Sequence, residues 1–512
     1  PREGQYERIS WDEAIDLAAS KLKEVIEKHG NEAVYVPYAT GVSATTSRPF
    51  NRFLNLVGGY LNFYNSYSTA QISCITPYMY GSKNNGGSSL SSGEDAKLIL
   101  CFGSSPTETR QGGLTTHYDW VHMRERTGAK IYMIEPRFND SNFGHSEEWL
   151  PINPGTDAAL VAALGHELIK NGQTDEEFLH TYCVGYDEET MPEAYQGKNM
   201  SYKDYIMGTG YDKVEKTPEW AAEICGSPAE DLERLALMLG GAERAAVITA
   251  PALARTGSGA QLCQNLMAFG AMAGLIGKPG CCCASDCGHS WMQGGFETLL
   301  KGGMNHANPR NSTLGNMERI PNPLEYRKVN VNQMWTSIVD ERKYIGLDGK
   351  TYDNNVHMIY DRQENFLNQG PATMKGIEAY RMMDTVVAQN LVMTTNCKYA
   401  DIVLPVASPW ERYGDLSPAY RETIVWFSQV VEPLFECKSD ADIALELADR
   451  IGVDRSVLRP VSEKQLIINM VAASQVSPNC DDNWQNLVSI TEEDLAELGV
   501  EGEPQDGLVP IL

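Results

Sequence analysis

Short apolar runs that alternate with helical periodicity are the feature that most constrains the fold of this chain. Leu98–Phe102 is an uninterrupted apolar run, which is typical of a strand buried on both faces. A helix is predicted from about residue 115, a strand over Lys130–Ile134, and then the strand Trp149–Ile152 and the helix Thr156–Lys170. Strands that alternate with helices in this way predict a parallel sheet with helices on both of its faces.

The same alternation continues toward both ends of the chain. Ser10 and Glu13 have the spacing of a capping box, and apolar residues at helical spacing then predict a helix to about His29. Further strands are predicted over Glu32–Tyr38, Ala245–Ala250, Asn355–Tyr360, Thr385–Gln389 and Asp401–Pro405, and further helices over Arg48–Val57, Gly259–Leu275, Asp440–Ile451 and Glu463–Ala473. Because 512 residues exceed what one core usually holds, the predicted fold class is α/β with two doubly wound, Rossmann-like parallel-sheet domains.

Composition narrows the partners that such a chain can have. A formal net charge of −26 argues against direct binding to nucleic acid or to an anionic membrane surface. No stretch is long and apolar enough to span a bilayer, so we expect no direct membrane contact. The 12 cysteines lack the dense spacing of a disulfide scaffold.

One group of cysteines permits two readings. Cys281, Cys282, Cys283 and Cys287 form either a metal site or a loop of small residues. We favour the loop, because adjacent cysteines rarely point at one ion and structural zinc sites separate paired ligands by a few residues. The role of these four residues stays open.

Polar and small residues follow two of the predicted strands. Gly103-Ser104-Ser105-Pro106 ends the first run, and Glu135 follows the next. Ligands of open α/β sheets bind beyond the carboxyl ends of strands, where an acidic residue accepts hydrogen bonds from ribose hydroxyls. A nicotinamide dehydrogenase would need Gly-x-Gly-x-x-Gly after the first strand, and this chain does not provide it.

Five segments, in order along the chain, resemble the dimethyl sulfoxide reductase family of molybdopterin oxidoreductases. The first, Tyr67-Ser68-Thr69-Ala70-Gln71, is similar to the molybdenum-ligand loop of the family, and the second, Phe102–Arg110, is similar to its Gly-Asn-Asn-Pro-x-Glu-Thr-Arg loop. Ile134–Arg137 is similar to the Ile-Asp-Pro-Arg strand end, and Ile152–Leu160 is similar to the Pro-Gly-Thr-Asp-x-Ala-Leu helix start. The last, Tyr399–Pro405, is similar to the Ala-Asp-Ile-Val-Leu-Pro strand. Each motif alone is weak, whereas all five in order are strong. The resemblance is greatest to the anaerobic, membrane-complex type of catalytic subunit.

The resemblance implies a molybdenum ion held by two molybdopterin guanine dinucleotides, with Ser68 as a catalytic protein ligand of the metal. A polar surface loop is what the residues around Ser68 suggest on their own. Hard, high-valent molybdenum suits an alkoxide oxygen. The cofactor-binding residues implied in this way are Tyr67, Gly103, Ser104, Ser105, Pro106, Thr109, Arg110, Glu135, Arg137, Gly155, Asp157, Arg255, Gly259, Asn365 and Asn368.

Several of these residues have expected roles. Glu135 would hold a ribose and Asp157 the guanine edge, although Thr156 as N-cap and Asp157 in the first turn also fit plain capping. Arg110 and Arg137 would contact phosphate, unless they are ordinary surface arginines. Arg255 and Gly259 lie in a loop that would contact a pterin, and Asn365 and Asn368 near the second dinucleotide. The family usually has Asp where Glu135 stands, and Lys278–Cys281 replaces an expected Gly-rich turn.

The resemblance also implies the domain organisation. Residues 1–85 and 300–512 would form a discontinuous α/β domain that carries the molybdenum-ligand loop, and residues 86–299 an inserted dinucleotide-binding α/β domain. The start at Pro1 without Met suggests a fragment. The cysteine-bound four-iron four-sulfur cluster and the closing domain of the family would then belong to the full-length protein. We expect the isolated chain to fold, to bind its cofactors poorly and to be inactive.

The implied function is that of a catalytic subunit that removes oxygen from a small S-oxide or N-oxide such as dimethyl sulfoxide. A related reduction, for example aromatic dehydroxylation, and an inactive cofactor-binding fragment are the alternatives. Besides the small-molecule oxidant, the implied partners of the full-length protein are an iron–sulfur electron-transfer subunit and a membrane anchor subunit. The implied location is the exported side of the membrane in the bacterial cell envelope, through a subunit complex.

Overall fold

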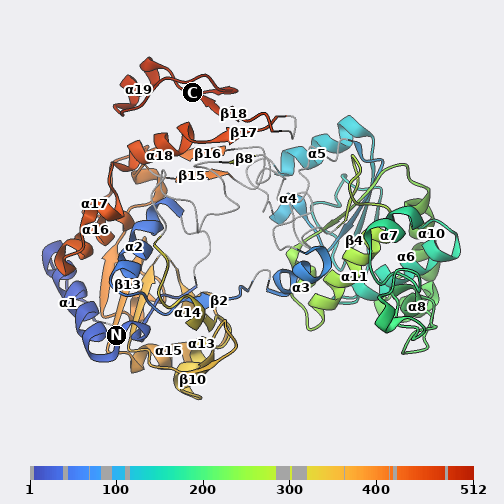
Figure 1. Cartoon of the computed structure of the whole chain (residues 1–512), viewed down its shortest axis with the longest axis horizontal. Helices are drawn as coiled ribbons and strands as arrows, with labels where there is room; N and C mark the ends of the chain where they lie inside the picture. The colour runs from blue at the N-terminus through green and yellow to red at the C-terminus, as the bar shows by residue number, and fades with distance from the viewer. Residues whose placement is uncertain are drawn as a thin grey trace. The chain divides into compact units, whose positions relative to one another are not determined.

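A computed structural model describes residues 5–38, 44–67, 70–81, 95–109, 116–283, 300–301, 320–362, 364–413, 415–418, 424–478 and 482–511 (Figure 1). The chain divides into two compact units. The first unit comprises Pro1–Tyr67, Leu299–Pro418 and Ile424–Leu512, and the second comprises Ser68–Thr298 with Ala419–Thr423. The predicted boundary near residue 85 therefore differs from the observed one after Tyr67. The reason is that α3 (Ala70–Tyr80) packs on α11 (Gly259–Met272) and places Ile72 in the core of the second unit.

The second unit is built on a five-stranded parallel sheet in the order β5-β4-β3-β6-β7. Its strands are β3 (Leu98–Phe102), β4 (Lys130–Glu135), β5 (Glu148–Pro151), β6 (Ala245–Thr249) and β7 (Cys282–Cys283). The chain adds β4 and β5 on one side of β3, and then β6 and β7 on the other side. The strand order thus reverses at β3, and such a switch point is where open α/β sheets bind ligands.

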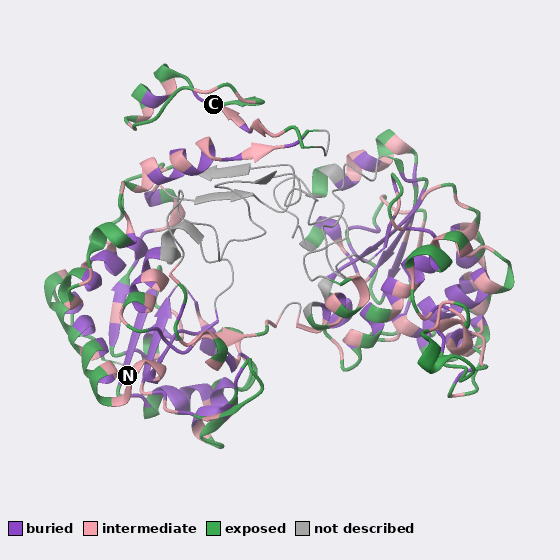
Figure 2. Cartoon of the chain, viewed as in Figure 1, coloured by how far each residue is buried: buried purple, intermediate pink, exposed green. Residues whose placement is uncertain are grey.

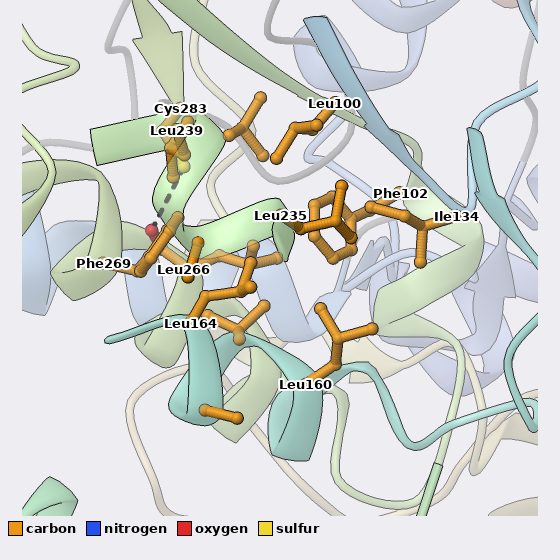
Figure 3. Close-up of a cluster of buried hydrophobic side chains, with 14 of the residues drawn as sticks. Leu100, Phe102, Ile134, Leu160, Leu164, Leu235, Leu239, Leu266, Phe269 and Cys283 are labelled. Carbon is orange, nitrogen blue, oxygen red and sulfur yellow. Dashed lines mark hydrogen bonds between the residues drawn. The ribbon is translucent and has the colours of Figure 1, made fainter. Parts of the chain in front are cut away.

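Alternate residues of β3 face the two layers of helices. Leu98, Leu100 and Phe102 join a cluster with α6 (Asp157–Lys170), α10 (Ala229–Gly241) and α11. Figure 3 shows Leu160 and Leu164 of α6, Leu235 and Leu239 of α10, and Leu266 and Phe269 of α11 gathered around β3 and Ile134. Ile99 and Cys101 instead pack with residues of α5 (Thr116–Thr127). This two-sided burial explains why β3 reads as a continuous apolar run.

The first unit is built on a four-stranded parallel sheet in the order β1-β12-β13-β14. Its strands are β1 (Val34–Tyr35), β12 (Met358–Arg362), β13 (Thr385–Asn390) and β14 (Ile402–Pro405). One face packs on α1 (Trp11–His29), α2 (Ala44–Leu56) and α16 (Asp440–Ile451), and the other packs on α13 (Met334–Val339) and α15 (Thr373–Met382). Figure 2 shows the strands of this sheet as buried, with exposed residues on the outer sides of the helices.

Shorter elements complete both units. The second unit contains α4 (Pro106–Thr109), α7 (Glu176–Tyr182), α8 (Tyr202–Ile206) and α9 (Pro218–Cys225). The first contains α14 (Phe366–Gln369), α17 (Arg455–Leu458), α18 (Glu463–Ala472) and α19 (Glu492–Leu498). Four pairs of short strands also belong to the first unit: β2 (Phe63–Tyr64) with β9 (Val329–Asn330), β10 (Lys343–Ile345) with β11 (Thr351–Asp353), β15 (Asp415–Pro418) with β16 (Ile424–Phe427), and β19 (Val488–Ser489) with β20 (Val509–Pro510). In addition, β17 (Gln475–Val476) pairs with both β8 (Leu300–Lys301) and β18 (Gln485–Asn486). Among the described residues, no helix has the length and apolar character needed to cross a bilayer.

The structure corrects the prediction of a loop at the cysteines. Cys282 and Cys283 form β7 at the edge of the second unit's sheet, and each packs into a different hydrophobic cluster. Consecutive residues of a strand point to opposite faces, so these two thiols do not converge on one ion. The Cys283 thiol donates to the Leu266 carbonyl at 3.3 Å, and burial raises its pKa well above the usual value (Figure 3). Cys287 lies outside the described residues.

Candidate cofactor-binding site

The turn after β3 requires glycine at its first position. Gly103 has φ = +53°, and its N–H donates to the Ile134 carbonyl at 3.1 Å. A Cβ at this position would lie 2.3 Å from a methyl carbon of Leu253. The turn leads directly to Ser104, which is fully buried, and whose hydroxyl has no hydrogen-bond partner among the residues that the structure describes. The close approach of the backbone therefore places an unused polar group at the switch point.

Two buried carboxyl groups lie near this turn. Burial, with a further contribution from the charge of Asp157, raises the pKa of Glu135 to about 7, while Arg137 and the Ser104 N–H act in the opposite direction. Burial also raises the pKa of Asp157 to about 6. Glu135 is 8% exposed and Asp157 4%, and Oε1 of Glu135 has no partner in the described part of the chain. The two groups interact although 22 positions separate them in the sequence (157 minus 135).

A third polar group at the same edge was not predicted. Thr249 ends β6, is buried, and has a hydroxyl without a hydrogen-bond partner among the described residues. Phe102 is in register with Ile134 on one side and with Thr249 on the other, so Ser104, Glu135 and Thr249 lie at the carboxyl ends of three adjacent strands. Thr249 is a lone polar residue in an apolar run, which is the only sequence signal for it.

This donor set fits a nucleoside. Buried polar groups cost free energy unless they are hydrogen-bonded, so hydroxyls and carboxylates without partners are expected to have partners in a bound ligand. A ribose offers hydroxyl donors and a guanine offers two N–H donors to a carboxylate. The residues present are therefore compatible with the guanosine end of a dinucleotide.

Of the two arginines predicted to contact phosphate, the structure describes only Arg137. Arg137 is engaged by Glu108 through two hydrogen bonds of 3.1 and 2.5 Å, and this ion pair holds the pKa of Glu108 below its usual range. Glu108 lies on α4, which Pro106 begins and Thr109 ends. A phosphate at Arg137 would have to share the guanidinium with Glu108. Arg110 lies outside the described residues.

The neighbouring serine at the turn is occupied by protein contacts. The Ser105 hydroxyl lies 3.1 Å from that of Ser141, which also accepts from the Thr107 N–H at 3.1 Å. Ser141, in the loop after β4, thus supports the turn that contains Ser105. This contact was not visible in the sequence, because Ser141 follows no motif.

The predicted pterin-contacting turn is held in place by Gln71. The Gln71 side-chain amide donates to the Thr256 carbonyl at 2.8 Å and accepts from the Ala260 N–H at 2.7 Å. This clamp joins α3 to the turn that contains Arg255, which is exposed. Gly259 begins α11, and a Cβ there would lie 2.0 Å from the Ala254 carbonyl oxygen. Gln71 was noted only as part of a motif, and its clamping role was missed.

The start of α6 lies close to the same turn. Gly155 has φ = +78°, and its Cβ position is 3.6 Å from the Thr256 methyl group. Thr156 is the N-cap residue of α6, as predicted, but its hydroxyl donates to the Asn153 carbonyl at 2.6 Å and makes no capping hydrogen bond to the helix. Asp157, the first residue of α6, is the buried acidic group at this helix start.

In the first unit the predicted residues lie around the end of β12. The Tyr67 ring stacks at 6.1 Å from Phe366 and meets Tyr38 edge-on at 5.1 Å. The Asn365 side chain accepts from the Asn396 N–H at 3.2 Å, and Asn368 on α14 is exposed. Ser68, the predicted metal ligand, lies outside the described residues.

Two buried acidic residues at this edge were missed. Asp361 and Glu364 are 1% and 3% exposed, and three of their four carboxylate oxygens have no hydrogen-bond partner in the described chain. Burial raises the pKa of Asp361 to about 7, although the Tyr380 hydroxyl donates to it at 2.6 Å. The pKa of Glu364 is raised further, by burial and by the Asp361 charge. Charged residues directly after the apolar run of β12 were the available signal.

Comparison with known proteins identifies the family. The family model for molybdopterin oxidoreductases matches residues 2–450, so the chain belongs to this family, within the dimethyl sulfoxide reductase group. The putative dimethyl sulfoxide reductase chain YnfE of Escherichia coli is 36% identical over 476 residues, which cover 88% of this chain and 55% of that protein. The dimethyl sulfoxide reductase DmsA of the same organism is 34% identical over 499 residues, covering 92% and 58%.

More distant similarities extend the comparison. Trimethylamine-N-oxide reductase of Vibrio vulnificus is 27% identical over 525 residues, covering 94% of this chain and 60% of that protein. Acetylene hydratase from Pelobacter acetylenicus matches in structure with a TM-score of 0.63 and 22% identity, over 91% of this chain and 62% of that one, which shows a shared fold. The chain spans 55% to 60% of the length of these reductases. The family implies a molybdopterin cofactor.

The raised pKa of Glu135 predicts a pH-dependent stability. Its pKa is about 7 in the folded chain and about 4.5 for an ordinary glutamate, so the unfolded chain binds fewer protons between these values. Stability therefore falls as pH rises from about 4.5 to about 7. Glu135→Gln removes this dependence and should stabilise the cofactor-free chain at pH 8 relative to pH 4, by up to about 3 kcal/mol. Urea unfolding at the two pH values measures it.

A matched control uses an exposed glutamate of the same unit. Glu177→Gln on α7 removes an exposed carboxyl group from the same unit and gives the reference change in the free energy of unfolding at each pH. An equal effect of Glu135→Gln at pH 4 and pH 8 would show that the Glu135 carboxyl group is not the source of the pH dependence.

Proposed function

We propose that this chain is the cofactor-binding core of a molybdenum reductase that removes the oxygen atom of a small S-oxide or N-oxide, such as dimethyl sulfoxide. The observation that carries the proposal is the set of buried polar groups without partners at the carboxyl edge of the second unit's sheet, Ser104, Glu135 and Thr249. Family membership names the cofactor class that such a site serves. The relatives named as dimethyl sulfoxide and trimethylamine-N-oxide reductases support the substrate class.

Each unit is proposed to hold one guanine dinucleotide of a bis(molybdopterin guanine dinucleotide) cofactor. In the second unit, Glu135 accepts from ribose hydroxyls and Asp157 from the guanine N–H groups, because both carboxyl groups are buried and near one another. In the first unit, Asn365 and Asn368 serve the second dinucleotide, with Asp361 as a further acceptor at the same strand end. The cofactor, once bound, supplies the two-electron chemistry, and the protein supplies orientation and exclusion of water.

Ser68 is the residue proposed to contact the metal. Its hydroxyl offers a hard oxygen donor, which high-valent molybdenum prefers. The ring of Tyr67, the preceding residue, packs against Phe366 and Tyr38. A serine ligand favours oxygen-atom removal. Aromatic dehydroxylation is the alternative reaction, and a cofactor-binding segment without activity of its own is the alternative role.

The full-length protein is proposed to work in a complex. A four-iron four-sulfur cluster, an iron–sulfur subunit and a membrane anchor subunit would deliver electrons on the exported side of the bacterial membrane. The similarity to the dimethyl sulfoxide reductase DmsA supports this setting.

Metal and cofactor analysis of the full-length protein, produced anaerobically, tests the function. We expect one molybdenum and two guanine dinucleotides per chain, and oxidation of a reduced dye by S-oxides or N-oxides. Absence of molybdenum would refute the proposed function. A molybdenum enzyme that reduces aromatic hydroxyl compounds but neither oxide class would refute the substrate assignment.

The isolated chain provides a second measurement. We expect mass spectrometry after gel filtration to show less than stoichiometric dinucleotide, because so large a ligand needs most of its surface enclosed and this chain spans only 55% to 60% of the length of the reductases that it matches. Full retention would show that this chain is sufficient for binding.

A further inference from the structure

Three potential metal ligands meet at the amino edge of the first unit's sheet. His29 ends α1, His357 directly precedes β12, and Asp384 directly precedes β13. The strands of this sheet are parallel, so their amino ends share one edge. Asp361 and Asn365 lie at the opposite, carboxyl edge. The three residues therefore form a cluster separate from the proposed cofactor site.

The donor atoms of this cluster lie at suitable separations. Oδ2 of Asp384 is 3.1 Å from Nδ1 of His357 and 3.4 Å from Nε2 of His29. The two imidazole rings stack with centroids 3.6 Å apart and planes 7° apart. All three donor atoms lie within 4.8 Å of one another. Tetrahedral zinc with bonds of about 2.0–2.1 Å separates its ligand atoms by about 3.3–3.4 Å, so the two distances to the Asp384 oxygen are close to those of such a site.

The Nε2 atom of His29 makes no hydrogen bond within the described part of the chain. Nε2 of His29 is buried and has no hydrogen-bond partner among the described residues, because its approach to Asp384 does not meet hydrogen-bond geometry. A buried nitrogen without a partner calls for a ligand.

Hydrogen bonds to the backbone of His29, His357 and Asp384 hold these three residues in place. The His357 N–H donates to the Ala33 carbonyl at 2.9 Å, and the Asp384 N–H donates to the His357 carbonyl at 2.8 Å. The Asn355 side chain donates to the His29 carbonyl at 2.9 Å. An ion would therefore require only side-chain rotation, in which one of the stacked rings turns so that both nitrogens converge on it.

We propose that His29, His357 and Asp384 bind one divalent transition-metal ion, with Zn²⁺ as the reference ion. Two imidazole nitrogens and one carboxylate oxygen are a donor set of zinc, and three protein ligands leave a fourth position for water. Asp384 is exposed, which gives the ion access. The carboxylate and the negative end of the α1 dipole offset the charge of the ion. The site would join the end of α1 to the start of β12 and β13.

Calorimetric titration of the untagged, chelator-treated chain with ZnCl₂ tests the proposal. We expect one saturable site per chain. His29→Ala, His357→Ala and the isosteric Asp384→Asn should each weaken binding at least about 10-fold, the lower end of the loss caused by removing even an outer-shell partner. Zn²⁺ should raise the melting temperature of the wild-type chain and not that of the double variant His29→Ala/His357→Ala. Far-UV circular dichroism checks that each variant is folded.

His180→Ala is the matched control. His180 lies in the second unit with Glu176 and Asp187, at similar donor separations, but its Nε2 is already paired with Asp187 at 2.9 Å. This variant should bind Zn²⁺ as the wild type does. Unchanged affinity in the His29→Ala/His357→Ala variant, or no saturable binding by the wild type, would overturn the proposal and leave a cluster in which His357 alone is hydrogen-bonded to Asp384.

Discussion

Replacing Ser68 with alanine is expected to abolish substrate reduction by the full-length enzyme while the fold is retained. Alanine removes the hydroxyl oxygen that is proposed to bind the metal, and a methyl group cannot replace it as a donor. Ser68 lies in a polar run of the sequence, so the loss of one oxygen should not disturb a core. Turnover with dimethyl sulfoxide and the electron paramagnetic resonance spectrum of the molybdenum centre measure the effect.

Ser66→Ala is the control, because it removes a hydroxyl from the same segment two residues earlier. We expect its turnover and spectrum to match those of the wild type. A Ser68→Ala enzyme with a wild-type metal spectrum would contradict the ligand role, even if its turnover were lower.

Asp157→Asn is expected to weaken retention of the guanine dinucleotide by the full-length enzyme roughly 10- to 100-fold. The carboxylate is proposed to accept both guanine N–H groups, whereas an asparagine amide would present an N–H₂ group where an acceptor is needed. Hydrogen bonds to a charged group contribute about 1.5–3 kcal/mol, which corresponds to that range of affinity. Guanine dinucleotide content after dialysis and gel filtration measures the loss.

The pH dependence of dinucleotide retention tests whether the negative charge of Asp157, and not only the shape of its side chain, is needed for binding. Burial raises the pKa of Asp157 to about 6, and the ionised form is the one that accepts both N–H groups. Retention by the wild type should therefore increase as pH rises through about 6, and the Asp157→Asn enzyme should lose this part of the dependence. Glu177→Gln should behave as the wild type. Equal retention by Asp157→Asn and the wild type at pH 8 would exclude Asp157 as a guanine ligand.

Local sequence patterns predicted the individual elements well. α1 has Ser10 as its N-cap and ends at His29, and α16 covers Asp440–Ile451 before Gly452, as the periodicity and capping residues indicated. Both helices are specified by contacts within one or two turns. The strand predicted over Glu32–Tyr38 is shorter in the structure, where only Val34–Tyr35 pairs with β12. Asn31–Ala33 form a 3-10 helix before it, and the Val36 N–H after it donates to the Leu61 carbonyl at 3.2 Å.

Both the sequence motifs and the tertiary structure were needed to find the candidate site. Motifs pointed to Glu135 and Asp157 separately, but only the folded chain shows that both are buried and that one raises the pKa of the other. Thr249 and Asp361 were missed, because a single polar residue in or after an apolar run looks the same whether it faces solvent or a ligand. The clamp of Gln71 on Thr256 joins residues 185 positions apart, which no local pattern encodes.

The sequence by itself determined the α/β class, the alternation of elements and the family, because periodicity and short motifs are properties of neighbouring residues. The tertiary structure decided the strand order, the switch point at β3, and the meeting of His29, His357 and Asp384. These features depend on which strands pair and which helix covers which face. Such choices are settled by burial summed over a whole core, and so they appear only once the chain has folded.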